Sequence, residues 1–471
     1  MCQEKKNRKR RFVILGGGPS GLAAAWTLVQ RGHEVTVIEK ELHCGGMAST
    51  FSRGNFRFDL GPHIVHSPHT YLIECLRRKL GNEFRKHDSV NEVYFNGCRV
   101  TYPFSGFGLL KVLSLVTAAR CVMSYFSRRI QITFKNIFKD DGSYHTWLVN
   151  RFGAYFFDIF FGPYTEKVWG VSTMDLSDII AKRRIPVRSL HALVRTAITR
   201  RSDYHPENSG SLACYYHSQG SGKITEYFHD EILRHDGKII TNAQLRHLTV
   251  NGRNIVGVEF FVPEQGIGTI QETNGEHGED ELIFLSTIPI NHLIRYFGES
   301  VPEEVRESAA RIDYTAMIFL YLELDTTDPL GVDILYFSEK EFPFNRISDV
   351  GKFSRDMVPA GRTALCLEIT CTEGDAVWHL GDQEIYDMCL GPLERHGFLT
   401  RKNVLDYHTR RLTHAYPRFR IGYERHVELL THYINHSIDN LRTFGRQGLF
   451  SYINTDEALL MGFEAADRYS Y

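Results

Sequence analysis

The sequence predicts an α/β fold, in which a Rossmann-type domain is split into separated segments of the chain and an α+β region is inserted between them. Three observations support this prediction. The chain opens on a strand, a helix and a second strand; residues 222–289 again alternate helix and strand; and a short strand and a helix follow residue 440. Parallel sheets are built from such units, and their neighbouring strands need not be consecutive in sequence.

The opening unit carries a glycine-rich turn. Residues 11–16 (RFVILG) form an apolar strand, 21–31 a helix and 33–40 (HEVTVIEK) a second strand, and residues 16–21 (GGGPSG) fit the pattern GxGxxG. The first glycine permits a tight turn, the second lets a pyrophosphate approach the backbone, and the third lets the helix pack closely on the strand. A carboxylate at the end of the second strand is placed to accept hydrogen bonds from a ribose. We therefore expect a dinucleotide site that includes Gly16, Gly18, Pro19, Ser20, Gly21, Glu39 and Lys40.

Two further features favour FAD over a nicotinamide dinucleotide. The segment Cys44-Gly45-Gly46-Met47 offers a second close approach of backbone to ligand, which adds Gly45, Gly46 and Met47 to the expected cofactor site. A loop containing Gly445 and Arg446 leads into a helix from about residue 455, whose positive end would favour a reduced, anionic flavin. No second GxGxxG is present for a nicotinamide domain.

The later segments complete the expected domain. Residues 222–261 are expected to form a helix, a strand, an Asn-Gly turn and another strand, and residues 282–289 a short buried strand. We therefore assign residues 1–80, 215–294 and 420–471 to a discontinuous FAD-binding domain, and residues 81–214 and 295–419 to a substrate-binding region with helices and antiparallel sheet.

Composition excludes several classes. The 55 Lys and Arg against 56 Asp and Glu leave a net charge of −1, so the basic field that binds nucleic acid is missing. A 42% hydrophobic content with 24% charged residues is that of a globular protein. The nine cysteines are scattered without a CxxC pair, no HExxH or GxSxG occurs, and Pro62 and Pro68 interrupt the run His63, His66 and His69, so we expect no metal site and no hydrolase nucleophile.

The N-terminal residues and one apolar stretch bear on location. Residues 1–11 (MCQEKKNRKRR) pass directly into a strand without the apolar segment of a signal peptide, so we expect a cytoplasmic protein. Residues 104–126 (FSGFGLLKVLSLVTAARCVMSYF) are strongly apolar, but Lys111 and Arg120 argue against a membrane span. The stretch is expected to form a buried or amphipathic helix, and peripheral contact with a membrane remains open.

Four short motifs, and FNRIS as a weaker fifth, identify the family that the sequence resembles. They are FDLGPHIVH (58–66), FFGPYTEKVWG (160–170), RRIPVR (183–188), FNRIS (344–348) and GRQGLFSYIN (445–454). With the glycine turn they resemble the flavoprotein group that includes amine oxidases, protoporphyrinogen oxidases and UDP-galactopyranose mutases. Within that group the motifs are most similar to the mutases.

This resemblance implies roles for individual residues. In the cofactor site, Gly61, Pro62 and His63 would lie beside the flavin, together with Arg446 and Asn454. In the substrate site, Phe160 and Tyr164 would stack on a base and Trp169 would lie beside the sugar. Arg184 and Arg188 would bind the pyrophosphate, and Arg346 and Tyr452 would hold the diphosphate near the flavin. Arginine forks, aromatic faces and tyrosine hydroxyls suit such a ligand. The alternative is that the aromatic residues belong to the core and the arginines to the surface. Asn454 stands where bacterial mutases carry an Asp, which leaves the sugar open.

The leading hypothesis is therefore an FAD-dependent, mutase-like isomerase acting on a nucleotide-diphosphate sugar. The resemblance implies a pyranose/furanose-type ring rearrangement through a flavin N5–sugar adduct, with His63, Arg184, Arg346 and Tyr452 as catalytic residues. An oxidase or desaturase of the amine oxidase or protoporphyrinogen oxidase type is the alternative enzyme. A flavin-binding scaffold without turnover is a third reading.

Overall fold

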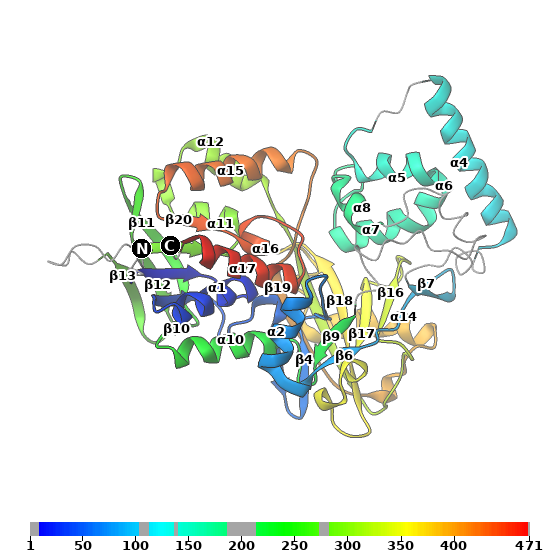
Figure 1. Cartoon of the computed structure of the whole chain (residues 1–471). Coiled ribbons are helices and arrows are strands. Elements are labelled where there is room, and N and C mark those ends of the chain that lie inside the picture. Colours follow the sequence, from blue (N-terminus) through cyan, green and yellow to red (C-terminus); the bar gives the residue numbers. More distant parts are fainter. Residues whose placement is uncertain (1–8, 103–112, 136–139, 186–212, 273–281, 470–471) are drawn as a thin grey trace.

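The computed structural model describes residues 9–102, 113–135, 140–185, 213–272 and 282–469. Its first layer is a five-stranded parallel sheet in the order β10-β2-β1-β14-β20 (Figure 1). The strands are β1 (Arg11–Leu15), β2 (Glu34–Ile38), β10 (Lys238–Ile240), β14 (Leu282–Ser286) and β20 (Leu441–Thr443). Strands from three distant parts of the chain therefore form one sheet, and the expected α/β class is confirmed.

Helices cover both faces of this sheet. The helix α1 (Pro19–Gln30) packs against α17 (Thr455–Tyr469) and α10 (Gly222–Arg234), and α11 (Ile290–Arg295), α12 (Glu303–Arg311) and α15 (Tyr423–Ser437) pack together (Figure 1). An Ala-rich face lets α1 lie close to its neighbours, because Ala23, Ala24 and Ala25 are completely buried. The strands β11 (Gln244–Asn251), β12 (Asn254–Val262) and β13 (Gly266–Gln271) form a separate antiparallel sheet, in which the expected Asn-Gly turn joins β11 to β12.

The second layer is a seven-stranded sheet in the order β19-β15-β18-β17-β16-β7-β8. Its members are β7 (Asn91–Phe95), β8 (Cys98–Tyr102), β15 (Tyr314–Leu324), β16 (Ile334–Phe337), β17 (Arg346–Asp349), β18 (Thr363–Cys371) and β19 (Val404–Pro417). Alternate residues of β15 point to opposite faces, as expected for a strand buried on both sides. Ile318 and Leu320 face the helix α14 (Asp382–Arg395), and Phe319 and Tyr321 face the hairpin of β3 (Thr50–Arg53) and β4 (Phe56–Asp59).

Small elements connect the two layers. The short strands β5 (Val65–His66), β6 (Phe84–His87) and β9 (Cys214–His217) form a three-stranded sheet in the order β5-β9-β6, next to α2 (Thr70–Leu80). A four-residue helix, α13 (Val350–Phe353), follows β17, and another, α16 (Gly445–Gly448), follows β20. The turns after β1, β2 and β20 therefore lie at the carboxyl ends of parallel strands, where ligands bind in open α/β sheets.

A helical layer caps the far end of the second sheet (Figure 1). It contains α4 (Leu115–Lys135), α5 (Tyr144–Phe152), α6 (Ala154–Phe156), a π-helical turn η3 (Phe157–Phe161), α7 (Gly162–Trp169) and α8 (Ile179–Arg184). The helix expected within 104–126 therefore occupies 115–135 in the described part of the chain, while 103–112 lie outside it. None of the described helices is long and apolar enough to cross a membrane.

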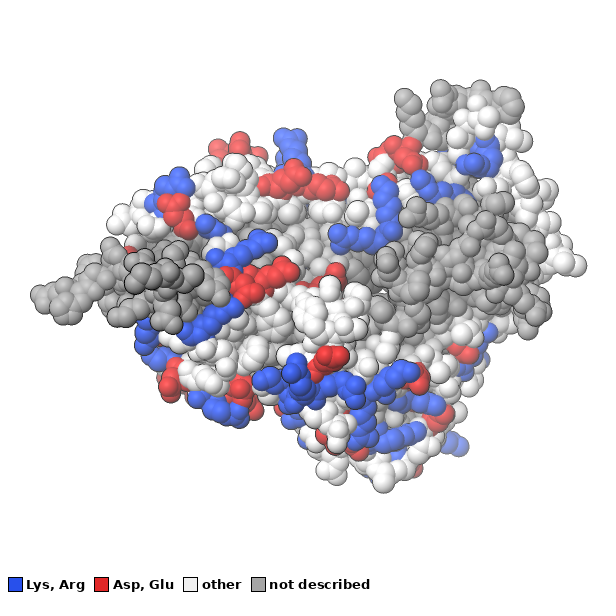
Figure 2. Space-filling view, in the orientation of Figure 1, with Lys and Arg blue, Asp and Glu red and all other residues white. Residues whose placement is uncertain are grey.

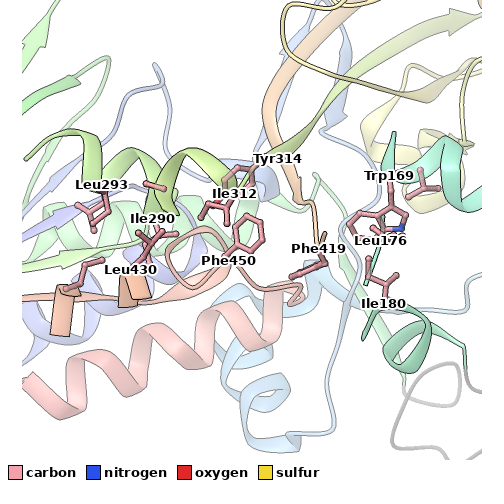
Figure 3. Close-up of a cluster of buried hydrophobic side chains, with 14 of the residues drawn as sticks. Trp169, Leu176, Ile180, Ile290, Leu293, Ile312, Tyr314, Phe419, Leu430 and Phe450 are labelled. Atoms are coloured by element: carbon pink, nitrogen blue, oxygen red, sulfur yellow. The ribbon is translucent and has the colours of Figure 1, made fainter. Parts of the chain in front are cut away.

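One buried cluster joins this helical layer to the first sheet. Figure 3 shows Trp169, Leu176 and Ile180 close to Phe419, and Phe450 and Tyr314 continuing toward Ile290 and Leu430. The side chains of Leu176, Ile290 and Leu430 are fully buried. Charged groups are distributed over the visible face of the molecule with both signs present (Figure 2), in keeping with the near-zero net charge. The domain boundaries given above remain a prediction, and α12 packs on the first layer although it falls within 295–419.

Candidate functional site

The glycine turn after β1 leaves the start of α1 open. Gly16 has φ +102°, a conformation that favours glycine, and a Cβ there would lie 2.5 Å from Thr287 Oγ1. Gly18 is the N-cap of α1 and has no side chain to bond the first N–H groups. A Cβ on Gly18 would meet nothing within 4 Å, whereas one on Gly21 would lie 2.0 Å from the carbonyl oxygen of Gly16. The second glycine therefore faces open space where a phosphate can approach, and the third allows close packing.

Glu39 lies beside this turn at the end of β2. Its Oε2 accepts the Gly17 N–H at 2.6 Å, its Oε1 accepts the Glu41 N–H at 2.9 Å, and the residue is 6% exposed. Burial raises the pKa of this carboxyl, while the two backbone donors oppose that shift. Glu39 thus braces the glycine turn as well as lining the cavity. The neighbouring Lys40 is exposed and pairs with Glu41 over 3.4 Å.

A single cavity of about 1850 Å³ extends from the glycine turn to the helical layer. This exceeds the roughly 300–1000 Å³ of pockets for one drug-sized ligand, so it can hold an extended dinucleotide together with a second molecule. Most of the residues expected from the sequence line it: Gly16, Gly18, Pro19, Ser20, Glu39, Lys40, Gly46, Met47, Pro62, His63, Phe160, Tyr164, Trp169, Arg346, Arg446, Tyr452 and Asn454.

His63 and two arginines form the central part of the cavity wall. His63 Nε2 lies 3.0 Å from the carbonyl oxygen of Leu60, which can only accept, so Nε2 carries the proton and Nδ1 keeps its lone pair. Burial, with a smaller contribution from the positive charges of Arg346 and Arg446, lowers the pKa of His63 to about 4. The imidazole is therefore neutral at pH 7.

The two arginines are held by different partners. Arg346, at the start of β17, donates from Nε to Glu368 Oε1 over 2.5 Å, and Glu368 is 1% exposed on the adjacent strand β18. Arg446, in α16, donates to the carbonyl oxygens of Ile453 and Ala415, and its guanidinium lies 4.9 Å from the ring centroid of Tyr452. Both cations are thereby fixed in direction at the cavity wall.

The aromatic residues are partly cavity wall and partly core. Trp169 is 2% exposed and contacts Tyr416, Phe419 and Tyr452, and Figure 3 shows it within the buried cluster. Phe160 is 9% exposed and stacks on Phe156 with ring centroids 5.5 Å apart. These aromatic residues therefore line the cavity and also belong to the hydrophobic core, so each of the two alternatives considered from the sequence is correct in part.

Tyr164 is the more available of the expected stacking residues. It is partly buried on α7, and its ring centroid lies 6.3 Å from that of Tyr336 on β16. The π-helical turn η3 comes directly before α7, and such turns often occur at functional sites. Its extra residue per turn sets the direction in which the first turn of α7 faces the cavity.

Some expected residues do not line the cavity. Gly21 lies beneath the turn, and Gly45 (φ +122°) and Gly61 (φ +78°) shape the backbone behind it; a Cβ on Gly61 would lie 2.7 Å from Glu368 Oε1. The backbone of Arg184 ends α8, but its side chain and the whole of Arg188 lie outside the described residues. Asn454 does line the cavity, but it is exposed, and its Nδ2 lies 3.4 Å from His66 Nε2.

Three residues that sequence reasoning missed also line the cavity. Arg183, one position before the expected arginine, donates from Nη1 to the carbonyl oxygen of Tyr452 at 3.3 Å. Tyr336 faces Tyr164, and Tyr416 stacks on Tyr452 with ring centroids 5.8 Å apart. The RR pair could have indicated Arg183, whereas the two tyrosines sit in ordinary strand sequence and carry no local signal. Within the described ranges, no three His, Cys, Asp or Glu side chains are grouped to hold a metal ion.

The chain was compared with protein families and curated proteins. A model of an NAD(P)-binding Rossmann-like domain matches residues 14–78. The chain is 47% identical over 60 residues to a 4,4'-diapophytoene desaturase (4,4'-diaponeurosporene-forming) of Staphylococcus haemolyticus (13% of this chain, 12% of that protein), and 41% identical over 98 residues to one of Staphylococcus aureus (20% of each). The chain thus covers a fifth or less of the length of these relatives.

Solved structures match over nearly the whole chain. The structure of reduced UDP-galactopyranose mutase superposes with a TM-score of 0.82 at 20% identity, covering 98% of this chain and 95% of that one. An oxidoreductase from Methanosarcina mazei gives 0.64 at 16% (97% and 100%), and wild-type putrescine oxidase bound to putrescine gives 0.63 at 16% (98% and 99%). The chain therefore shares the overall fold of these solved structures, and its first segment matches a Rossmann-like domain. The expected cofactor FAD is consistent with this fold, with the open space beside Gly18 and with the position of the Glu39 carboxylate.

Proposed function

We propose that this protein is an FAD-dependent isomerase of the nucleotide-sugar mutase type. The proposal rests on one observation: the cavity that starts at the dinucleotide turn continues to a wall where Arg346 and Arg446 flank a neutral His63 and an aromatic surface. Two fixed guanidinium groups beside aromatic faces suit a ligand that combines a diphosphate with a base. The full-length likeness to reduced UDP-galactopyranose mutase supports the same choice.

The arginines would bind the diphosphate of the substrate. A guanidinium presents parallel N–H donors that match phosphate oxygens, and Arg346 keeps donors available because only its Nε is bonded to Glu368. The hydroxyl of Tyr452 would add an uncharged donor beside Arg446. Arg184 and Arg188 remain in the proposal as further phosphate ligands from the RRIPVR segment, and Arg183 joins them from the same helix.

The aromatic wall would bind the nucleoside and the sugar. Tyr164, opposite Tyr336, would stack on the base, with Phe160 behind it, and Trp169 would form the wall next to the sugar. Stacking of a base on an aromatic ring contributes about 1–3 kcal/mol. Most of this wall is held rigid by the core, which reduces the entropy lost when the ligand binds.

In the proposed reaction, some residues of the cavity would hold the diphosphate and others would position the cofactor. Reduced FAD, when bound, would supply the nucleophile for the anomeric carbon as the sugar leaves the diphosphate. The arginines and Tyr452 would keep the departed diphosphate in place, so that it returns to the rearranged sugar at high effective concentration. Nδ1 of His63, which keeps its lone pair, would accept a hydrogen bond within the cofactor site. No net oxidation occurs in this reaction.

An oxidase or desaturase is the second candidate. Curated relatives with 41% and 47% local identity are diapophytoene desaturases, and putrescine oxidase shares the fold over 98% of this chain. A desaturase would abstract a hydride from an apolar substrate and pass electrons to an acceptor. An apolar substrate would contact the aromatic wall but would offer no anionic group to the guanidinium groups of Arg346 and Arg446 at the cavity wall, which is why we rank this function second.

The deciding experiment uses the purified, FAD-loaded protein. The dithionite-reduced protein is incubated without oxygen with UDP-galactopyranose and a panel of other nucleotide sugars, and isomer formation and shifts in the flavin absorbance on adding UDP are measured. Turnover with Tyr164→Ala should drop at least tenfold, whereas Tyr71→Ala, on the exposed face of α2, should match the wild type. Oxygen-dependent peroxide release with an amine or a polyene, together with no response to any nucleotide, would favour the second candidate.

A further inference from the structure

The helix α4 carries an apolar stripe that faces away from the protein. Six of the fifteen large hydrophobic side chains that are exposed among the described residues lie on this one helix. They are Leu115 (91% exposed), Val116 (62%), Val122 (43%), Met123 (62%), Phe126 (58%) and Ile130 (57%). Figure 1 shows α4 at the outermost edge of the helical layer, and Figure 2 shows that edge as largely uncharged.

The stripe covers one continuous face of the helix. At about 100° per residue, the six side chains fall within an arc of about 120°. Cys121 is buried on the opposite face, where Ser124 Oγ accepts the Tyr155 N–H at 3.0 Å and Arg128 Nε donates to Asn150 Oδ1 at 3.0 Å. The helix is therefore anchored to α5 and α6 by its polar and buried face, and its apolar face is left outward, the reverse of an ordinary surface helix.

The charges on α4 match an anionic surface. The helix contains no Asp or Glu and carries Arg120, Arg128, Arg129 and Lys135. On the same helical projection, Arg120 lies about 40° beyond one edge of the stripe and Arg129 about 20° beyond the other. Both of these arginines are exposed. An apolar stripe with a cation on each flank is the pattern of helices that lie in the headgroup region of a membrane.

We propose that α4 docks this protein on an anionic phospholipid bilayer. The six apolar side chains would enter the boundary between headgroups and acyl chains, and Arg120 and Arg129 would meet lipid phosphates. A second copy of the chain is a poorer occupant, because two such stripes packed together would bring four arginines to the rim with no acidic side chain on either helix. The helix would lie on the membrane and not across it.

Docking would hold the cavity next to the membrane. α4 packs on α5 and α6, and α6 runs directly into η3 and α7, which contribute Phe160, Phe161 and Tyr164 to the cavity wall. The proposed lipid contact on α4 would therefore be nearer to the substrate end of the cavity than to the end at the glycine turn. The inference does not rest on the proposed function, because either candidate enzyme would dock in the same way.

The test measures cosedimentation of the FAD-loaded full chain with vesicles. Vesicles of phosphatidylcholine alone are compared with vesicles that contain about 30% phosphatidylserine, at about 0.1 M and 0.5 M salt. We expect binding to the anionic vesicles that weakens at high salt. Phe126→Glu should reduce the partition coefficient at least tenfold. Arg120→Gln combined with Arg129→Gln should reduce it about thirtyfold on anionic vesicles, since the two cations together contribute about 2 kcal/mol.

Matched measurements separate docking from misfolding. Ile267→Glu, at a position 68% exposed on β13, should leave vesicle binding unchanged, and melting temperatures and flavin content confirm that each variant is folded. Absence of binding to anionic vesicles, or an equal loss in Ile267→Glu, would overturn the proposal. It would equally be overturned if light scattering showed a wild-type dimer that Phe126→Glu dissociates while neither protein binds vesicles.

Discussion

Arg183 reaches from the last turn of α8 to the carbonyl oxygen of Tyr452, with 3.3 Å between Nη1 and the oxygen. Tyr452 belongs to the loop between α16 and α17, so this hydrogen bond ties the helical layer to the segment that follows β20. Both residues line the cavity. Arg183 thus contacts the backbone of the residue whose ring lies 4.9 Å from the guanidinium of Arg446.

We expect Arg183→Ala to weaken nucleotide binding. The substitution removes one hydrogen bond, worth about 1 kcal/mol, and one positive charge from the cavity, so the dissociation constant for UDP should rise about five- to tenfold. Titration calorimetry with UDP measures this. Arg306→Ala removes an exposed arginine paired with Glu299 and should bind UDP like the wild type. An unchanged UDP affinity in Arg183→Ala would remove this residue from the site.

Glu368→Gln should destabilise the protein and misdirect Arg346. The pair is enclosed, with Glu368 1% exposed, and loss of one partner leaves a cation without its counter-charge, at a cost of about 3 kcal/mol in the free energy of unfolding. Urea unfolding measures the cost. Glu299→Gln, in an exposed ion pair, should change it by less than about 1 kcal/mol. Equal effects of the two substitutions would contradict a special role for Glu368.

Two glycines of the same turn should respond differently to alanine. Gly18→Ala places a Cβ in open space at φ −77°, so the protein should keep its melting temperature but bind FAD at least tenfold more weakly, because the methyl group occupies the path of the pyrophosphate. Gly21→Ala places a Cβ 2.0 Å from a carbonyl oxygen and should lower the melting temperature by several degrees. Flavin absorbance and thermal unfolding distinguish the two. Unchanged FAD affinity in Gly18→Ala would contradict the proposal that the pyrophosphate approaches the backbone at Gly18.

The neutral state of His63 predicts a pH dependence of stability. Below pH 6.5 the unfolded chain protonates His63, whereas the folded protein does not until about pH 4, so the free energy of unfolding falls as the pH falls through this range. Above pH 6.5 the residue contributes no pH dependence. His63→Gln should therefore gain about 1–2 kcal/mol relative to the wild type between pH 7.5 and pH 5. Urea unfolding at both pH values tests this, and a pH-independent difference would show that the pKa of His63 is the same in the folded and unfolded states.

Much of the first layer could be predicted because its signals are local. The strand β1, the glycine turn and β2 follow each other within 30 residues, and the helix expected from about residue 455 is found at Thr455–Tyr469. The helix after the turn begins at Pro19 and not at residue 21, because proline is favoured in the first turn of a helix. The second sheet was less accessible: β15 is a continuous apolar run, which fits a buried helix as well as a buried strand.

The site shows the same division. The glycines and Glu39 follow from one motif, whereas the bond from Arg346 to Glu368 depends on the register that places β17 opposite β18, and no spacing in the sequence reveals it. The RR pair indicates this end of a six-residue helix, but it does not show that Arg183 lines the cavity. The outward apolar face of α4 could not be predicted either, since periodicity gives the stripe but not the side on which the protein lies.

The order of the first sheet also constrains biosynthesis. β1 begins at Arg11, its neighbour β14 at Leu282 and the edge strand β20 at Leu441, so nearly the entire described chain must leave the ribosome before this sheet is complete. Pairing of parallel strands that are distant in sequence is slow, and the edges of the strands already formed stay exposed until their partners are synthesised. The loop with Arg446 and Tyr452 comes later still, so the cavity closes last. Nascent chains should therefore depend on chaperones, and flavin supplied during synthesis should be taken up only after the segment with Arg446 and Tyr452 has emerged.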